Sequence, residues 1–172
     1  MRKPRPLSRD TGSLRDTRLF IVACDDTYAP KQYFGFFKNS RVQVHVVPTE
    51  DTRCDALHVL RRLQEFEHEA EDELWLLLDT DHYAQGTHLQ NFTAALREAR
   101  QQGIHVALSK PSFEMWLLLH RVEGGAIGPS WNANRVAAAL RANLGHYNKT
   151  NLQPEDYRSH SIGRLQKGQM AG

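Results

Sequence analysis

Short apolar runs alternate with segments of helical periodicity along the first two thirds of the chain. The apolar runs are a few residues long and are bounded by polar or turn-forming residues, which is typical of buried strands. They cover residues 18–24, 42–47, 74–78 and 104–109. Segments with apolar positions at helical spacing separate them, at residues 31–38, 55–68 and 91–102. This alternation predicts a three-layer α/β fold, with a mainly parallel sheet and helices on both faces.

The pattern changes at a helix that follows the fourth predicted strand. Residues 115–119 read Met-Trp-Leu-Leu-Leu, so this helix is hydrophobic on nearly every side and is expected to be buried. Pro111 suits the first turn of the helix, and Ser112 is a candidate for its N-cap. A glycine-containing loop follows, and two further helices are predicted at residues 134–143 and 154–168.

The composition is that of a soluble globular protein. Hydrophobic residues make up 40% and charged residues 24% of the 172 positions, and a chain of this length predicts one domain. No apolar run approaches the roughly 20 residues that a membrane helix needs. The two cysteines, Cys24 and Cys54, lack the spacing of a metal motif, so we expect a reducing, cytoplasmic location. Cys24 ends a predicted strand and is expected as a small buried residue rather than a nucleophile.

Basic residues are concentrated at the N-terminus. Residues 1–18 hold six basic and two acidic side chains, whereas the whole chain has a formal net charge of only +2. Proline and glycine in the same stretch, with little apolar content, disfavour a packed core. We interpret residues 1–17 as a flexible basic arm that can contact nucleic-acid phosphates, or equally as a plain solvated tail, ahead of a domain at residues 18–172.

Two aspartates close the third predicted strand. Asp79 and Asp81 follow the run from Leu74 to Leu78, and open α/β sheets bind ligands beyond the carboxyl ends of their strands. Side chains two residues apart on a strand point the same way. The pair is therefore a candidate site for Mg²⁺ or Mn²⁺, which prefer oxygen ligands. The simpler alternative is that these are turn residues, since aspartate is common at strand ends.

Two more aspartates, Asp25 and Asp26, end the first predicted strand. If the first and third strands are neighbours, these carboxylates approach Asp79 and Asp81, and clustered acids repel one another unless a cation neutralises them. The metal interpretation therefore predicts that the four acids lie close together, with Asp25 as a further ligand. The alternative is that Asp26 or Thr27 caps the helix that follows.

Glu114 is the acid with the least ordinary surroundings. It lies in the first turn of the apolar helix, where the helix dipole stabilises an exposed carboxylate by roughly 0.3–1 kcal/mol. That effect alone accounts for a glutamate at this position. An acid at the start of a buried helix also needs a partner, and the candidates are Lys110, a histidine or a metal ion.

A polar cluster, Tyr147-Asn148-Lys149, lies in a later loop. Lys149 is a candidate for binding a phosphate group, as is Lys110. The simpler interpretation of Lys149 is a solvated surface lysine, because most lysines in loops are exposed to water.

These motifs together resemble the RloB-like family. The most specific part is PSFEMWLLLH at residues 111–120, placed after the acidic pair of LLLDTDH. The aromatic pair Tyr33-Phe34 in the first predicted helix matches the family, and Tyr147-Asn148-Lys149 is similar to its later tyrosine–lysine element. The likeness covers roughly residues 18–158.

The resemblance implies a Toprim-like fold and a place among restriction and phage-defence genes. The activity it implies is Mg²⁺-dependent nuclease action on DNA or RNA, with nucleic acid and an operon-encoded protein as partners. In that scheme Asp79 and Asp81 hold the metal ion, and Asp25 or Asp26 is a further ligand or the general base. Glu114 completes the cluster. Lys110 or Lys149 would steady a phosphate.

The first motif departs from the Toprim-like pattern. Such folds usually present a glutamate after the first strand, whereas this chain has Asp25 and Asp26. Aspartate is one methylene shorter, and a displacement of ~1 Å in a catalytic group can lower a rate on the order of 100-fold. The alternative function is therefore a catalytically degenerate module that binds nucleic acid, a signalling nucleotide or a partner protein.

Overall fold

The computed structural model describes residues 18–49, 53–81 and 86–158. The predicted N-terminal arm at residues 1–17 and the end of the last predicted helix, from residue 159 on, lie outside the described residues.

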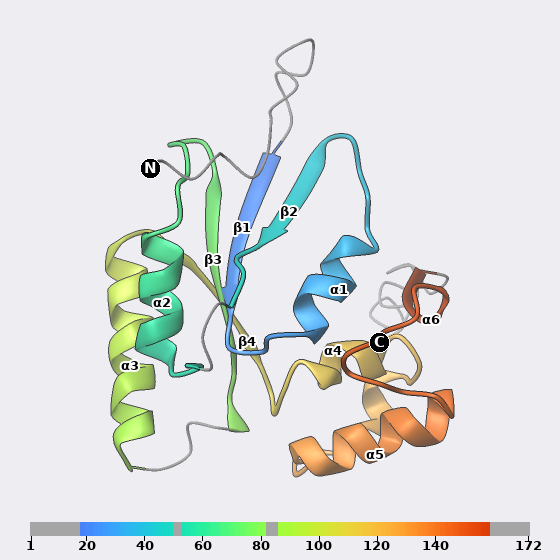
Figure 1. The fold of residues 1–172 in the computed structure, drawn as a ribbon. Coiled ribbons are helices and arrows are strands. Elements are labelled where there is room, and N and C mark those ends of the chain that lie inside the picture. The colour runs from blue at the N-terminus through green and yellow to red at the C-terminus, as the bar shows by residue number, and fades with distance from the viewer. Residues whose placement is uncertain (1–17, 50–52, 82–85, 159–172) are drawn as a thin grey trace, which may run out of the picture.

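The four strands form one parallel sheet in the order β2-β1-β3-β4 (Figure 1). The strands are β1 (Arg18–Cys24), β2 (Val42–Val46), β3 (Glu73–Asp79) and β4 (His105–Ser109). The central strands β1 and β3 are neighbours, which meets the condition for the acids that end the first and third predicted strands to approach one another. All four carboxyl ends lie on one edge of the sheet, toward the bottom of the view in Figure 1.

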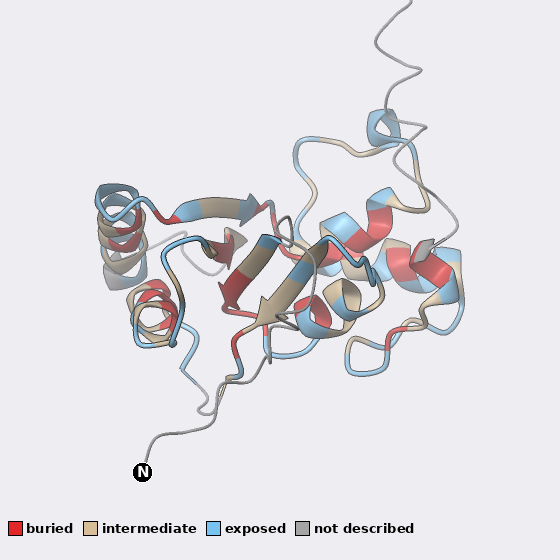
Figure 2. Cartoon of the chain, turned by 90° about the horizontal axis from the view of Figure 1, so that it is seen from above, coloured by how far each residue is buried: buried red, intermediate tan, exposed pale blue. Residues whose placement is uncertain are grey.

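Helices cover both faces of the sheet, as the alternating pattern predicts. They are α1 (Ala29–Gly35), α2 (Ala56–Gln64), α3 (Gly86–Gln101), α4 (Glu114–Leu119), α5 (Ala133–Leu144) and α6 (Glu155–Arg158), with a short 3-10 turn η2 (Gly124–Ala126). Helices α2 and α3 pack on one face, and α1, α4 and α5 on the other (Figures 1 and 2). The three-layer α/β fold predicted from the sequence is confirmed.

The central strands supply both hydrophobic cores by alternation. In β1, Ile21 packs toward α2 and α3, whereas Val22 packs toward α1 and α4. In β3, Leu76 and Leu78 join the first core and Leu77 the second. Because successive side chains of a strand point to opposite faces, an apolar strand in the middle layer is buried on both sides. Figure 2 shows the buried residues on the surfaces that face the sheet.

Local capping sets several helix boundaries. The Asp55 carboxylate accepts a hydrogen bond from the His58 amide at 3.2 Å, at the start of α2. Asn132 caps the start of α5, where its side chain accepts a hydrogen bond from the Arg135 amide, and Gly145 caps the end with a φ of 71°. That left-handed conformation favours glycine.

Helix α4 differs from its prediction. It has six residues and starts at Glu114, so Pro111 lies ahead of the helix and not in its first turn. The Ser112 hydroxyl donates a hydrogen bond to the Glu114 carboxylate and does not cap the helix. Trp116 is 46% and Leu119 40% exposed, so the expectation of a helix buried on nearly every side is wrong. The short helix buries one side against the sheet and leaves the other in solvent.

Across residues 18–49, 53–81 and 86–158, no helix has the length and apolar character needed to cross a membrane.

Candidate functional site

The carboxyl edge of the sheet gathers the acids that the sequence singled out. Asp25 follows the last residue of β1, and Asp79 is the last residue of β3. The Asp79 amide donates a hydrogen bond to Oδ2 of Asp25 at 3.0 Å, so the two strand ends are joined directly. Both residues are buried. The predicted proximity of these two acids is confirmed, and it follows from the adjacency of β1 and β3.

The segment between β4 and α4 brings Glu114 to the same edge. Asp79 pairs in register with Ser109, the last residue of β4. The Pro111 carbonyl then accepts hydrogen bonds from the amides of Thr80 at 2.9 Å and Asp81 at 3.1 Å. These bonds attach the chain ahead of α4 to the chain that leaves β3. The first residue of α4 therefore lies beside the strand ends.

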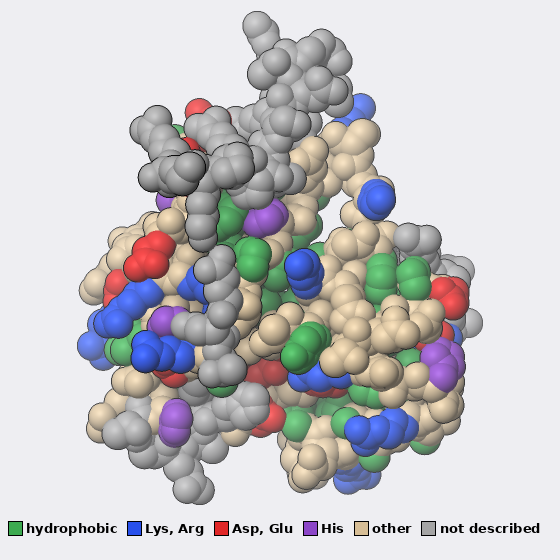
Figure 3. Space-filling view, in the orientation of Figure 1, with side chains coloured by type: hydrophobic (Ala, Val, Ile, Leu, Met, Phe, Trp, Pro, Cys, Tyr) green, Lys and Arg blue, Asp and Glu red, His purple; other side chains and the backbone are tan. Residues whose placement is uncertain are grey.

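Lys149 joins two of the acids. Its Nζ lies 3.1 Å from Oδ2 of Asp26 and 3.0 Å from Oε1 of Glu114. The two carboxylates are buried, while the lysine side chain is 41% exposed. The simpler interpretation of Lys149 as a solvated surface lysine is wrong, because its ammonium group bridges the end of β1 and the start of α4. Figure 3 shows acidic and basic side chains side by side at the lower centre of this face.

Asp26 also organises the start of α1. Its Oδ1 accepts hydrogen bonds from the amides of Tyr28 at 2.9 Å and Ala29 at 3.3 Å. The N-cap of α1 is Tyr28 and has no side-chain cap hydrogen bond, so neither Asp26 nor Thr27 is the N-cap residue that the sequence suggested. The Asp26 carboxylate instead binds the amides of Tyr28 and Ala29 and also belongs to the acidic group. We call Asp25, Asp26, Asp79 and Glu114 the acid cluster from here on.

Glu114 is held by three side chains. Besides Lys149, the Ser112 hydroxyl donates to Oε2 at 2.7 Å, and the Tyr147 hydroxyl donates to Oε1 at 3.3 Å. Burial alone would raise the pKa of Glu114, but Lys149 and the Ser112 hydrogen bond outweigh it and hold that pKa below its ordinary value. Glu114 is therefore an ionised carboxylate at neutral pH, with the partner that its position required.

Asp79 has the opposite electrostatic environment. Burial, followed by repulsion from Asp25, Glu114, Asp26 and Asp81, raises the pKa of Asp79 from 3.8 to about 8. Near neutral pH the cluster thus holds a largely protonated carboxyl beside an ionised one. Two neighbouring acids with their pKa values pushed apart are typical of sites where proton transfer or cation binding takes place.

Two other groups respond to the same field. Burial opposes a charge on Lys149, yet Asp26 and Glu114 more than compensate and raise its pKa above the ordinary value, so the ammonium form is favoured. Burial and the nearby aspartates raise the pKa of the Cys24 thiol. Cys24 is buried and its Sγ donates to the Asp26 carbonyl at 3.1 Å, which confirms the expectation of a small buried residue.

The loop that carries Lys149 is fastened to α1 by Gln32. The Gln32 Nε2 donates to the carbonyls of Lys149 and Tyr28, both at 3.0 Å. Its Oε1 accepts from the Leu152 amide at 2.9 Å. One side chain therefore positions the backbone at Lys149 and again three residues later, at Leu152.

Two contributors were not predicted from the sequence. Gln32 lies in a helical stretch where a polar residue is unremarkable, so no local signal indicates its role. Arg62 in α2 donates from Nη2 to the Cys24 carbonyl at 2.6 Å, which places a second cation at the end of β1. Its helical position between apolar residues predicts only a solvated face. Lys110, which the sequence suggested as a phosphate ligand, is exposed between β4 and α4.

The donors of the cluster are of the kind that Mg²⁺ and Mn²⁺ prefer, since all are carboxylate oxygens. Asp79, Asp81 and Asp25 are the carboxylates that the sequence suggested as ligands for such an ion. Within the described part of the chain, however, no three Asp, Glu, His or Cys side chains are already grouped as a set of metal ligands. Binding a divalent ion would therefore require these carboxylates to turn toward a common point.

The architecture defines the class of protein: a three-layer α/β domain with a parallel sheet and an acidic site at its carboxyl edge. The sequence matches the family described as RloB-like protein over residues 20–167, and the chain belongs to that family. The match confirms the resemblance carried by the motifs at residues 79–81 and 111–120. No curated protein and no solved structure matched the chain in the corresponding comparisons.

Proposed function

We propose that this RloB-like protein is a nuclease that hydrolyses phosphodiester bonds of DNA or RNA with the help of Mg²⁺ or Mn²⁺, in a phage-defence or restriction-linked setting. The observation that carries the proposal is the convergence of four buried acids beyond the ends of adjacent parallel strands. Open α/β sheets bind their ligands at this edge. Carboxylates forced together in a buried position are stabilised by a hard cation, which removes their mutual repulsion.

In this proposal each acid has a role that is compatible with its contacts. Asp79 and Asp81 would hold the ion, which supplies charge stabilisation for the phosphate and an activated water. Asp26 already accepts two backbone amides and faces Lys149. Asp25 in turn accepts the Asp79 amide, and we propose Asp25 or Asp26 as a further ligand or the general base. Glu114, ionised and held from three sides, positions Lys149 and closes the cluster.

The candidates for the phosphate also change once the contacts are known. Lys149 forms ion pairs with two carboxylates, so its positive charge is largely compensated within the protein and is less available to a phosphate. Lys110 is exposed beside the site, and Arg62 lies at the end of β1. Arginine and lysine both bind phosphate oxygens, arginine with a planar pair of donors.

The second candidate function is binding without cleavage. It is favoured by Lys149, because an ammonium group between Asp26 and Glu114 supplies inside the protein part of the positive charge that a metal ion would otherwise provide. Under this alternative the cluster is a structural ion-pair network, and the same edge of the sheet binds nucleic acid, a signalling nucleotide or a partner protein.

The test compares metal binding and cleavage in the same variants. Wild-type protein should cleave single- or double-stranded DNA or RNA with Mg²⁺ or Mn²⁺ and not with EDTA. It should also bind Mn²⁺ in calorimetry. The double variant Asp79→Asn/Asp81→Asn should lose both properties, and Glu114→Gln should weaken them with the fold intact. Glu123→Gln, an exposed acid outside the cluster, is the matched control and should behave as wild type.

Two results would redirect the assignment. Equal Mn²⁺ binding by wild type and the double variant would remove Asp79 and Asp81 from the metal site. A wild-type protein inert on every substrate, with and without the products of neighbouring genes, would favour binding without cleavage.

A further inference from the structure

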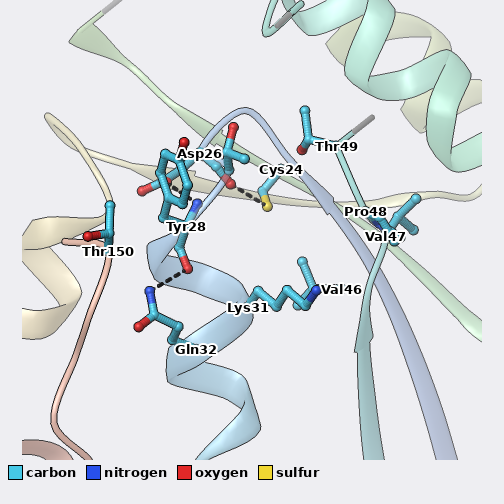
Figure 4. A pocket seen from close by; sticks show the side chains of 11 residues that line it. Cys24, Asp26, Tyr28, Lys31, Gln32, Val46, Val47, Pro48, Thr49 and Thr150 are labelled. Carbon is cyan, nitrogen blue, oxygen red and sulfur yellow. Dashed lines mark hydrogen bonds between the residues drawn. The ribbon is translucent and has the colours of Figure 1, made fainter. Parts of the chain in front are cut away.

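A pocket of about 320 Å³ opens beside the acid cluster, between the carboxyl ends of β1 and β2 and the start of α1 (Figure 4). Asp26 belongs both to the cluster and to the wall of this pocket. Its volume is at the lower end of the range for small-molecule sites, roughly 300–1,000 Å³. The pocket therefore suits one compact ligand that lies next to the acids.

The walls combine one aromatic ring with short polar groups. Tyr28 is 53% exposed and lines the pocket next to Asp26. Thr27, Thr49 and Thr150 contribute hydroxyl groups that both donate and accept hydrogen bonds. Lys31 is exposed and extends from α1 toward the end of β2 (Figure 4), where it adds a positive charge. A ligand that fits these walls has a flat aromatic part, polar edges and an anionic group.

Tyr28 is held in place although its ring is exposed. Its amide donates to Oδ1 of Asp26 at 2.9 Å, and its carbonyl accepts from Nε2 of Gln32 at 3.0 Å. The same Gln32 fastens the loop that bears Thr150, another residue of the pocket wall. Because the Tyr28 backbone is already held, only the rotation of its exposed side chain remains to be ordered when a base stacks on the ring.

We propose that this pocket binds one nucleotide unit, with its base against the ring of Tyr28 and its sugar–phosphate toward Lys31 and the acid cluster. The proposal rests on the proposed function, because it places a neighbouring phosphodiester next to Asp26 and Asp79. The nucleotide unit can come from a single-stranded nucleic acid or from a free nucleotide. A base inside a duplex has both faces covered, so stacking on Tyr28 selects an unpaired base.

The experiment measures binding in EDTA, so that it does not depend on metal-assisted cleavage. Fluorescence anisotropy is recorded with labelled single-stranded DNA and RNA 12-mers and with the corresponding duplexes. Competition with unlabelled AMP and UMP reports on free nucleotides. The variants are Tyr28→Ala, Tyr28→Phe and Lys31→Gln. Phe37→Ala is the matched control, since Phe37 is also an exposed aromatic residue but does not line the pocket.

We expect the single strands to bind more tightly than the duplexes. Tyr28→Ala should weaken that binding about 5- to 150-fold, which is the range for loss of one base–aromatic stack. Tyr28→Phe keeps the ring and should stay within about 3-fold of wild type, as should Phe37→Ala. Lys31→Gln should weaken binding and reduce its dependence on salt. Competition by AMP or UMP that Tyr28→Ala abolishes would support the pocket and identify a free nucleotide as a ligand.

Unchanged binding in Tyr28→Ala, or no binding by wild-type protein to any of these probes, would overturn the proposal. These outcomes are separate from those that decide the nuclease function. Nucleotide binding through Tyr28 with no cleavage under any condition would sustain the pocket while rejecting the nuclease. Metal-dependent cleavage that is equally efficient in Tyr28→Ala, with unchanged affinity for the single-stranded probes, would support the nuclease function and reject the nucleotide pocket.

Discussion

Replacing Asp79 with asparagine should stabilise the metal-free protein, and the gain should increase as the pH rises. The Asp79 side chain is buried, and burial together with the neighbouring acids raises its pKa from 3.8 to about 8. An acid whose pKa is higher in the folded chain than in the unfolded chain binds more protons when folded. Its ionisation therefore opposes folding. The free energy of unfolding should fall between about pH 4 and pH 8, by at most about 1.4 kcal/mol per pH unit.

The size of the effect follows from the same values. The full difference between 3.8 and about 8 corresponds to an upper bound of about 6 kcal/mol. The actual effect is smaller than this bound, because neighbouring acids share protons and their side chains relax. Replacing buried ionic groups by neutral ones of similar volume stabilises proteins by about 1–4 kcal/mol. We expect a gain of about 2 kcal/mol at pH 8.5 for Asp79→Asn and a smaller gain at pH 5. In a chain of this size, that is a rise in Tm of about 4–8 °C.

The assay is urea and thermal unfolding in EDTA at pH 5, 7 and 8.5. Wild type, Asp79→Asn and the control Glu123→Gln are compared under identical conditions. Glu123 is exposed, so its replacement should leave the pH dependence as in wild type. A variant Asp79→Asn that is no more stable than wild type at pH 8.5, or that differs by the same amount at every pH, would refute the reasoning that repulsion on Asp79 opposes folding.

Three further predictions concern the groups around Asp79. Lys149→Met should lower the free energy of unfolding by about 1–3 kcal/mol, because it leaves buried carboxylates without their shared cation. Urea unfolding of the double variant Lys149→Met/Glu114→Gln should show part of this loss restored. No restoration would contradict the ion pair between Lys149 and Glu114. The depressed pKa of Glu114 stabilises the fold above its ordinary pKa of 4.5, and that stability is lost as the pH falls. Glu114→Gln should therefore reduce the loss of unfolding free energy at acid pH. A loss equal to that of wild type would contradict a stabilising role of the ionised Glu114. Gln32→Ala should cost about 1–2 kcal/mol and speed amide hydrogen exchange in the loop that carries Lys149, whereas Gln43→Ala, exposed on β2, should alter neither; equal exchange in both variants would exclude the anchoring role.

The sequence by itself determined the order of the strands and helices along the chain and the acids that follow the strands. Local information is sufficient for this, because an apolar run such as residues 74–78 can only be buried between two layers, and polar residues then mark its end. Asp25 and Asp79 were identified in this way, and Glu114 was identified by its position at the start of an apolar helix. Family motifs at residues 111–120 added the RloB-like assignment.

The length and exposure of α4 were not predictable in the same way. The letters of residues 115–119 are apolar throughout, yet helix α4 lies over one layer only and leaves Trp116 and Leu119 partly exposed. How many sides of a helix are covered depends on which elements pack around it. The periodicity of apolar residues within the helix does not indicate how many such neighbours there are. The Trp116 indole also donates to the Ser109 hydroxyl at 3.0 Å, a contact that sequence spacing does not indicate.

Only the tertiary structure decided which charges meet. The strand order β2-β1-β3-β4 makes the ends of β1 and β3 neighbours, and a loop more than a hundred residues after Asp26 then brings Lys149 between Asp26 and Glu114. Gln32 holds that loop through two hydrogen bonds, to the Lys149 carbonyl and from the Leu152 amide. Each of these side chains is ordinary in its local context. Electrostatic energy depends on distance and burial in space rather than on separation along the chain, so the opposite pKa shifts of Asp79 and Glu114 exist only once the chain is folded.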